Sequence, residues 1–247
     1  MSETEKQVAL VTGSSSGIGA AIARQLGDQG MRIVVNSARS VDSGQRLARS
    51  LPDATYVRAD IRAPEQARHL VESAVEAYGR LDVLVNNAGT TRVIPHDDLS
   101  AATPEVWREI LDLNLIGSWQ VTTAAVPHLR KSDGGCVVNV SSVAGSRPAG
   151  SSIPYAVSKA ALEHLTRLLA KALGPEIRVN AVAPALTETP WTRDDPFFQG
   201  IAEQVRKVTP LRQVGTADHV AEAVLAVARS RHMTGVVLPV DGGAHLL

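Results

Sequence analysis

Short apolar runs recur along the chain, separated by longer stretches in which apolar positions are spaced three or four residues apart. The short runs have the length of strands and are mostly apolar at consecutive positions, which is typical of strands buried on both faces of a parallel sheet. Thr55–Val57 is a weak run of this kind. The six clearer predicted strands are Val8–Val11, Arg32–Val35, Val83–Val85, Val137–Val140, Ile177–Val182 and Val236–Val240.

The stretches between the runs have the spacing of helices that cover a sheet. Ile18, Ile22 and Leu26 repeat at every fourth position, and Pro104 predicts a helix start with Thr103 as its cap. Because strands and helices alternate, we predict an α/β fold with a doubly wound, seven-stranded parallel sheet, that is, a Rossmann fold. No repeat or linker divides the chain, so we expect residues 1–247 to form a single domain.

One long segment, from Pro184 to Pro210, follows neither pattern. It is rich in proline and holds Trp191, Phe197 and Phe198, three of the eight aromatic residues. Connections of this length are usually functional or mobile. We therefore predict an irregular substrate lid around residues 186–212.

Composition narrows the range of partners. The 25 basic and 25 acidic residues give no net charge, and no basic cluster marks a nucleic acid or an anionic membrane as a partner. Cys136 is the single cysteine, which excludes an internal disulfide and a multi-cysteine metal site and fits a reducing compartment. The first residues are charged, and no apolar stretch approaches the length of a membrane span. We expect a cytoplasmic protein.

A glycine-rich loop follows the first strand and opens the first helix. Gly13, Gly17 and Gly19 stand in the spacing G-x3-G-x-G. Glycines here permit a tight turn and bring the backbone close to a pyrophosphate, which the helix N-terminus stabilises. The alternative is a plain strand-to-helix turn. The spacing alone is a weak signal, and its position directly after the first strand and before a helix makes it a stronger one for a phosphate-binding loop.

Five motifs in this order resemble those of the short-chain dehydrogenase/reductase family, and the resemblance runs from Val8 to Gly243. They are the glycine loop, Asn86–Gly89, Asn114, Ser142 and Tyr155–Lys159. The resemblance implies reversible hydride transfer between a nicotinamide and a ketone or secondary alcohol, with no metal. The alternatives are a beta-ketoacyl-acyl carrier protein reductase and, more remotely, a catalytically silent NADP-binding sensor.

Tyr155 and Lys159 share one helix face because they are four residues apart. A tyrosine with its ordinary pKa of about 10 is a poor acid or base at neutral pH, and we expect the lysine ammonium to lower that pKa. Ser142 follows a strand, where its hydroxyl either donates to a substrate oxygen or makes a turn. For Asn114 the resemblance implies a water that links Lys159 to solvent, and the alternative is a local bond that bends the helix.

The resemblance also implies which residues contact the cofactor. For Asp60, an alternative role as a helix cap is equally compatible with the sequence. Ala185 replaces the glycine usual in the family, so its Cβ would strain the turn if that turn needs a positive φ. The expected cofactor contacts are Gly13, Ser15, Ser16, Gly17, Ile18, Gly19, Ser37, Arg39, Asp60, Ile61, Asn87, Ala88, Gly89, Tyr155, Lys159, Pro184, Ala185, Thr187 and Thr189.

The end of the second strand favours NADP(H) over NAD(H). NAD sites usually place an acid there, whereas Asn36–Ser40 holds no acid and one basic residue, Arg39. Asp133 and Pro175 stand where carrier-protein reductases usually carry basic residues, which favours a small-molecule ketone or alcohol as substrate. The resemblance further implies a homotetramer. The expected substrate contacts are Ser142, Tyr155, Ile94, His96 and Trp191.

Overall fold

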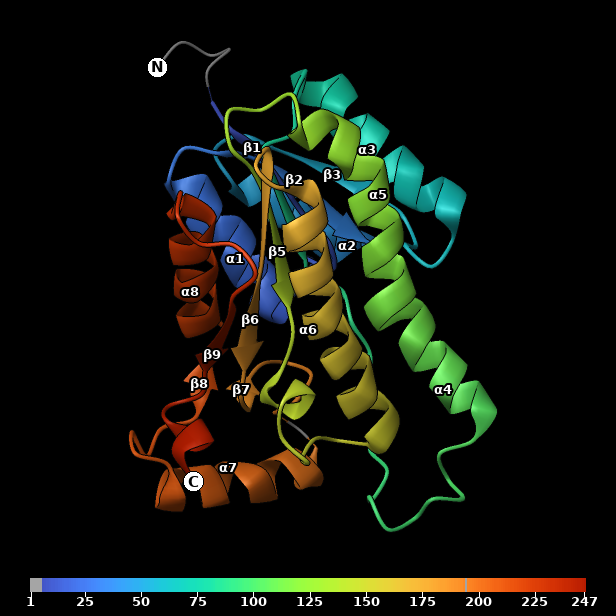
Figure 1. Cartoon of the computed structure of the whole chain (residues 1–247), viewed down its shortest axis with the longest axis vertical. Helices are drawn as coiled ribbons and strands as arrows, with labels where there is room; N and C mark the ends of the chain where they lie inside the picture. Colours follow the sequence, from blue (N-terminus) through green and yellow to red (C-terminus); the bar gives the residue numbers. More distant parts are fainter. Residues whose placement is uncertain (1–5, 194) are drawn as a thin grey trace.

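The computed structural model describes residues 6–193 and 195–247, and a seven-stranded sheet forms its centre (Figure 1). All neighbouring strands are parallel, and their order is β3-β2-β1-β4-β5-β6-β9. This confirms the predicted doubly wound sheet, including the weak strand at 54–58. The strands are β1 (Val8–Val11), β2 (Arg32–Ser37), β3 (Ala54–Arg58), β4 (Val83–Asn86), β5 (Gly135–Val140), β6 (Ile177–Pro184) and β9 (Val237–Val240).

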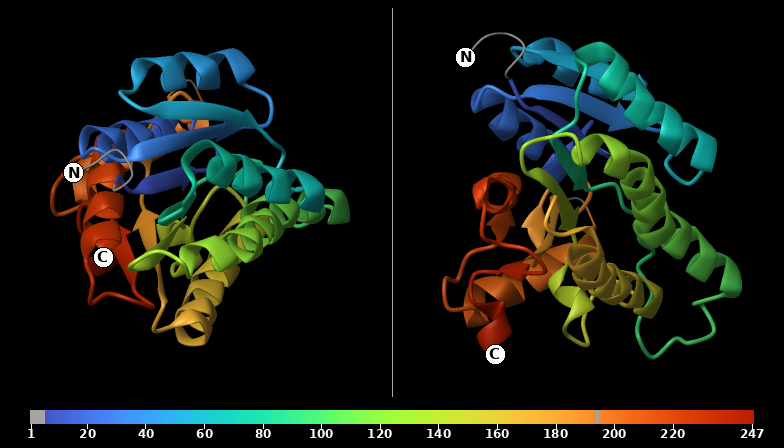
Figure 2. Two further views of the ribbon diagram at one scale, coloured as in Figure 1. Left: turned by 90° about the horizontal axis from the view of Figure 1, so that it is seen from above. Right: turned by 45° about the horizontal axis from the view of Figure 1, so that its top comes forward.

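Helices cover both faces of the sheet (Figures 1 and 2). In β1, Ala9 and Val11 belong to one apolar core, whereas Val8 and Leu10 belong to the other, and all four side chains are fully buried. The strands are therefore apolar at consecutive positions because each face meets a helical layer. The first layer is α1 (Gly17–Asp28), α2 (Val41–Ser50) and α8 (Ala217–Arg229), and the second is α3 (Pro64–Tyr78), α5 (Ser118–Leu129) and α6 (Ile153–Leu173).

A long helical column precedes β5. It consists of α4 (Pro104–Leu111), the π-helical turn η2 (Asp112–Gly117) and α5. Figure 1 shows α4 and α5 running on from one another at the right of the molecule. Thr103 is the N-cap of α4 and Pro104 its first residue, as predicted. The π-helical turn places a break in regular helix geometry at Asn114.

The prediction that Pro184–Pro210 is irregular is wrong where this segment forms a strand and a helix. Two residues form β7 (Thr187–Glu188), which pairs with β8 (Gly215–Thr216), and α7 (Pro196–Val208) follows. The helix begins where the Asp195 carboxylate accepts a hydrogen bond from the backbone of Phe197 at 2.9 Å, and Pro196 occupies the first turn. An acidic cap followed by proline is a helix-start signal, and it outweighs the high proline content.

Candidate active site

The glycine loop connects β1 to α1 at the carboxyl edge of the sheet. Gly13 and Gly17 adopt φ values of +61° and +54°, in the left-handed region that favours glycine. Gly19 has an ordinary φ, but a Cβ there would lie 2.5 Å from Nδ2 of Asn87 and 2.6 Å from the carbonyl oxygen of Gly13. The loop therefore keeps its shape only with glycine at these positions.

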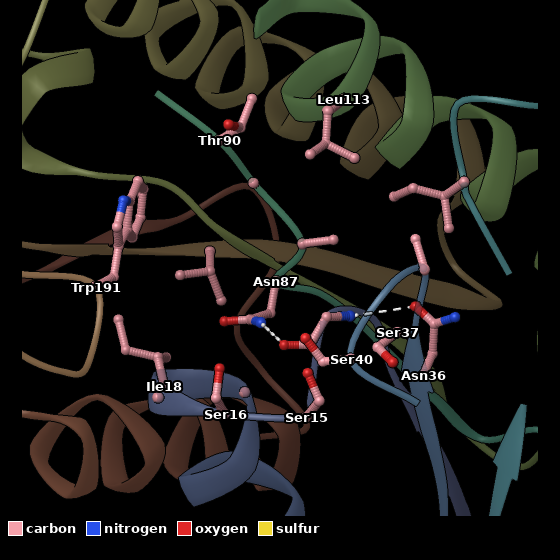
Figure 3. Close-up of a pocket in the computed structure, with 18 of the residues that line it drawn as sticks. Ser15, Ser16, Ile18, Asn36, Ser37, Ser40, Asn87, Thr90, Leu113 and Trp191 are labelled. Carbon is pink, nitrogen blue, oxygen red and sulfur yellow. Dashed lines mark hydrogen bonds between the residues drawn. The ribbon is translucent and has the colours of Figure 1, made fainter. Parts of the chain in front are cut away.

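Side chains from neighbouring strands hold this loop in place (Figure 3). The Asn87 amide donates to the carbonyl oxygens of Thr12 at 2.9 Å and Gly13 at 3.1 Å. The Thr12 hydroxyl in turn accepts from the backbone N–H groups of Asn87 and Ala88. On the other side, the Asn36 side-chain oxygen accepts from the Gly13 N–H at 3.2 Å. The ends of β1, β2 and β4 thus form one rigid support.

A cavity of about 450 Å³ lies over this support, beside the point where the strand order reverses between β1 and β4. Ligands of doubly wound sheets bind at such a position, and the volume lies within the usual range for ligand sites. Seventeen of the expected site residues line it: Gly13, Ser15, Ser16, Gly17, Ile18, Gly19, Ser37, Arg39, Asp60, Ile61, Asn87, Ala88, Gly89, Tyr155, Lys159, Thr189 and Trp191.

Helix α6 presents Tyr155 and Lys159 to the same cavity. The Ser152 hydroxyl caps the helix by accepting from the Tyr155 N–H at 3.4 Å. Lys159 is only 4% exposed; its Nζ donates to the carbonyl oxygen of Val140 at 2.8 Å and lies 5.7 Å from the centre of the Tyr155 ring. Burial lowers the pKa of Lys159 to about 8, so its ammonium is charged at neutral pH and loses its proton above that value.

The expected lowering of the Tyr155 pKa is not found. Burial raises the pKa of Tyr155, and a hydrogen bond with Ser142 opposes that effect without overcoming it. Desolvation of the phenolate is the dominant effect on this group. Tyr155 is therefore a protonated phenol at neutral pH, the form that can donate a proton.

Ser142 stands immediately after β5. Its oxygen accepts from the Ala144 N–H at 3.2 Å and so caps the 3₁₀ turn η3 (Val143–Gly145). This is the turn that the sequence allowed as an alternative. The bond uses a lone pair of the oxygen, so the hydroxyl hydrogen, which serves the hydrogen bond with Tyr155, can still be donated to a substrate oxygen. The turn and a role in oxyanion stabilisation are therefore compatible.

Asn114 is buried in η2 and bridges two segments beside the cavity. Its side-chain oxygen accepts from the Thr90 N–H at 2.8 Å, and its amide donates to the Thr90 carbonyl and the Ser158 hydroxyl, both at 3.0 Å. The local bond to the helix backbone is made by another residue, because Ser118 donates to the Asn114 carbonyl. The alternative that Asn114 only bends its own helix is therefore wrong.

Comparisons with known proteins agree on the family. A family model described as "Enoyl-(Acyl carrier protein) reductase" matches residues 13–245. The chain is 65% identical over 243 residues to "Granaticin polyketide synthase putative ketoacyl reductase 2" of Streptomyces violaceoruber, covering 98% of each chain. The chain belongs to the short-chain dehydrogenase/reductase family.

Two further relatives show the breadth of this similarity. The 3-oxoacyl-acyl-carrier-protein reductase FabG of Thermotoga maritima is 38% identical over 247 residues, covering 97% of this chain and 98% of that protein. The ligand-free aldohexose dehydrogenase of Thermoplasma acidophilum superimposes with a TM-score of 0.88 at 30% identity, covering 100% and 96% of the two chains. As a short-chain dehydrogenase/reductase, the protein is an oxidoreductase that acts on alcohol or ketone groups, and its family binds NAD(P).

The glycine loop has the form that the dinucleotide of the family requires. A Cβ at Gly13 would lie 2.8 Å from the Cα of Ala88, so the loop has the cradle form that brings backbone close to a pyrophosphate. Asp60 lines the cavity and forms a 2.5 Å ion pair with Arg62, whereas the N-cap of α3 is Ala63. The helix-cap alternative for Asp60 is therefore wrong. That ion pair keeps the pKa of Asp60 below its ordinary value.

Three expected cofactor contacts lie near the cavity without lining it. They are Pro184 at the end of β6, Ala185, and Thr187, whose hydroxyl donates to the Ala185 carbonyl at 3.1 Å. Among the described residues, the non-glycine residue with positive φ is Arg212. Ala185 therefore introduces no left-handed strain in place of the family's glycine.

A second cavity of about 640 Å³ adjoins the first and shares Trp191 and Glu109 with it. It contains Ile94, as expected for a substrate contact, whereas His96 is exposed and lines neither cavity. Arg92 pairs with Glu109 at 3.0 Å on its wall. The full lining is Thr91, Arg92, Val93, Ile94, Glu105, Val106, Glu109, Trp191, Asp195 and Phe198.

Sequence reasoning missed several residues that build the site. Asn36 supports the glycine loop, and Ser141 lines the first cavity, whereas the expected residue Ser142 lines neither cavity. Asn36 and Ser141 both stand at the carboxyl end of a parallel strand, where ligand sites of this fold gather, and this position was the available signal. In the described part of the chain, no three His, Cys, Asp or Glu side chains gather as a metal site. No helix there is long and apolar enough to cross a membrane.

Proposed function

We propose that the protein is an NADP(H)-dependent reductase of ketones, acting reversibly on secondary alcohols. The observation that carries this proposal is the arrangement on α6: a protonated Tyr155 and a buried Lys159 one turn apart, facing the cavity that the glycine loop also lines. When bound, the nicotinamide supplies or accepts the hydride.

The chain's own residues then carry out the proton chemistry. Tyr155 donates its phenolic proton to the substrate oxygen, and the hydroxyl of Ser142 donates a hydrogen bond that stabilises the negative charge developing there. Lys159 holds the nicotinamide ribose, and its ammonium stabilises the phenolate left on Tyr155. Asn114, which bridges the Thr90 loop and α6, holds the water through which Tyr155 regains its proton.

Tyr155→Phe tests the central role. We expect a fall in kcat of about 10²–10⁴-fold, because proton transfer by a positioned group contributes that much. The NADPH dissociation constant, measured by fluorescence titration, should stay nearly unchanged. Tyr78→Phe is the control, since Tyr78 lies on α3 and lines neither cavity. Unchanged turnover in Tyr155→Phe would remove that role, and NADPH binding without turnover of any ketone or alcohol would favour the silent sensor.

The preference for NADP(H) rests on the end of β2. Arg39 is exposed, lines the cavity and makes no ion pair among the described residues, so its guanidinium is available to a 2′-phosphate. We expect Arg39→Ala to weaken NADPH binding by about 10-fold or more while leaving NADH binding unchanged. Arg46→Ala, an exposed arginine on α2, is the matched control. Equal weakening of both cofactors would contradict the assignment.

The second cavity is the proposed place for the body of the substrate, with Trp191, Phe198 and Ile94 as its apolar contacts. We place a free ketone first. A beta-ketoacyl thioester is the second candidate, favoured by the 65% identity to a protein named as a polyketide ketoacyl reductase. Where carrier-protein enzymes carry a basic residue, the exposed Asp133 pairs with Arg231 at 3.6 Å. Turnover of free ketones, a small thioester and a carrier-bound thioester, compared by kcat/KM, separates these candidates.

We further propose that residues 1–247 act as one NAD(P)-binding domain with a lid at 186–212, in a cytoplasmic homotetramer. Exposed apolar side chains on the outer faces of α5 and α6 favour the assembly. Trp119 is 44% exposed and Leu168 is 53% exposed, and both would be covered by another subunit. A monomeric mass by light scattering would contradict the tetramer.

A further inference from the structure

A buried carboxylate that the proposed chemistry does not use lies directly behind the site. Glu163 is on α6, four residues after Lys159 and eight after Tyr155, and it is only 3% exposed. Residues at these intervals share a helix face, so the three side chains form one row along α6. A buried carboxylate is costly unless it is bonded and compensated, so its presence here needs a reason.

Two neighbouring segments fix the position of this carboxylate. The Ser141 hydroxyl donates to Glu163 Oε1 at 3.0 Å, and Ser141 is the residue before Ser142. Gly145 of η3 covers the carboxylate so closely that a Cβ there would lie 2.5 Å from Oε1. The carboxylate therefore joins α6 to the segment that carries the Ser142 hydroxyl.

The charged groups around Glu163 are few. Lys159 and Arg167, both on α6, are the cations that act on it, and Arg167 is exposed to solvent. The charged side chains of the other elements that pack on α6 have partners elsewhere or face solvent. On α4, Glu109 pairs with Arg92 and Glu105 with Arg108; on β6, Arg178 donates to carbonyls at the end of α8; and Asp112 of η2 is exposed. The Glu163 charge is accordingly felt mainly by the buried Lys159.

We propose that Glu163 is a positioning residue, whose buried carboxylate keeps the neighbouring Lys159 in its ammonium form and anchors the Ser141–Ser142 segment beside it. The influence of the Glu163 charge on Lys159 supports this proposal. Burial lowers the pKa of Lys159 to about 8, and the negative charge of Glu163 opposes that lowering. Without Glu163, Lys159 loses its proton at a lower pH, where it no longer stabilises a phenolate. This inference rests on the proposed role of Lys159.

Glu163→Gln tests the charge with little change in shape, because the glutamine oxygen still accepts from Ser141. The titration of Lys159 is followed by NMR of the cofactor-free protein labelled in its lysine side chains, which number five, with Lys159→Met to assign the signal. We expect the midpoint in Glu163→Gln to move about one pH unit lower. Glu163→Asp, which keeps the charge, should retain most of the original midpoint, and Glu176→Gln, an exposed carboxylate beyond α6, should leave it unchanged.

The turnover of Glu163→Gln should show the same displacement. We expect its kcat to fall with rising pH about one pH unit earlier than that of the original protein and to recover below that point. An unmoved Lys159 midpoint would overturn the proposal. So would a loss of kcat that is equal at every pH and accompanied by a lower Tm, since that is the result of a purely structural role. The NMR titration needs no turnover, so it decides this inference even if Tyr155→Phe contradicts the proposed function.

Discussion

Helices α1 and α7 border the two halves of the site, and they are held in opposite ways. Helix α1 packs into the core with Ile22 and Leu26 almost fully buried, and it begins at a loop fixed by bonds from β2 and β4. Helix α7 has no buried residue along its length, and Phe197 on it is 37% exposed. The proposed cofactor side is therefore a rigid part of the sheet, whereas the proposed substrate side is bordered by α7, which lies at the bottom of the molecule in Figure 1.

This difference indicates where substrate specificity can change with little loss of stability. In the glycine loop, a Cβ added at Gly13 or Gly19 would lie less than 3 Å from backbone atoms, so a side chain there displaces a loop that is bonded to β2 and to the segment after β4. In α7, Phe198 lines the second cavity and no residue is buried, so a change of Phe198 alters what fits in that cavity without disturbing the core. Loops and lids on a rigid scaffold commonly carry specificity for this reason.

The largest effect should come from adding one methyl group on the rigid side. In Gly19→Ala the new Cβ meets the Gly13 carbonyl oxygen at 2.6 Å, and the loop must shift. We expect NADPH binding to weaken by about 100-fold, with a loss of about 1–3 kcal/mol in the free energy of unfolding. Gly200→Ala on α7 is the matched control: its Cβ meets nothing within 4 Å, and alanine favours the helix. Similar NADPH binding in the two variants, by fluorescence titration, would break the comparison.

A smaller effect should follow from removing an aromatic ring on the exposed side. Phe198 lines the second cavity and packs edge-on against Phe197, with ring centres 5.1 Å apart. We expect Phe198→Ala to raise the KM for the ketone by about 10-fold, the effect of a lost apolar contact. The NADPH dissociation constant should not change. Phe197→Ala, whose ring does not line the cavity, should raise KM less, and an equal rise would show that α7 acts as a whole.

The smallest expected change is one in hydrogen exchange, which is measured on the protein without mutation. Amide hydrogens of α7 should exchange with solvent far faster than those of α1, because few buried contacts oppose local opening of α7. Hydrogen–deuterium exchange followed by mass spectrometry measures this difference directly. NADPH should slow exchange in the glycine loop more than in α7. Equal protection of the two helices in the free protein would contradict the view that the lid is loosely held.

The repeating pattern along the chain was sufficient to predict the sheet and the position of the cofactor loop. Consecutive apolar residues in β1 follow from burial on both faces, and G-x3-G-x-G after that strand follows from the space the loop needs. The sequence did not predict helix α7, because the many prolines between Pro184 and Pro210 indicated an irregular segment, whereas Asp195 followed by Pro196 is in fact a helix start. Asn36 and Ser141 were missed because their roles depend on which strand ends lie side by side.

The sequence by itself was sufficient to predict the fold class, the family and seventeen residues that line the first cavity, because strand burial and close backbone approach restrict residue types locally. Only the tertiary structure decided the ionisation of the site. The pKa of Tyr155 lies above its ordinary value rather than below it, because desolvation depends on everything packed around the ring. The tertiary structure also brings the Glu163 carboxylate into hydrogen-bond contact with Ser141, a residue 22 positions away in the sequence. Charges and contacts of this kind depend on three-dimensional distance, which no local pattern records.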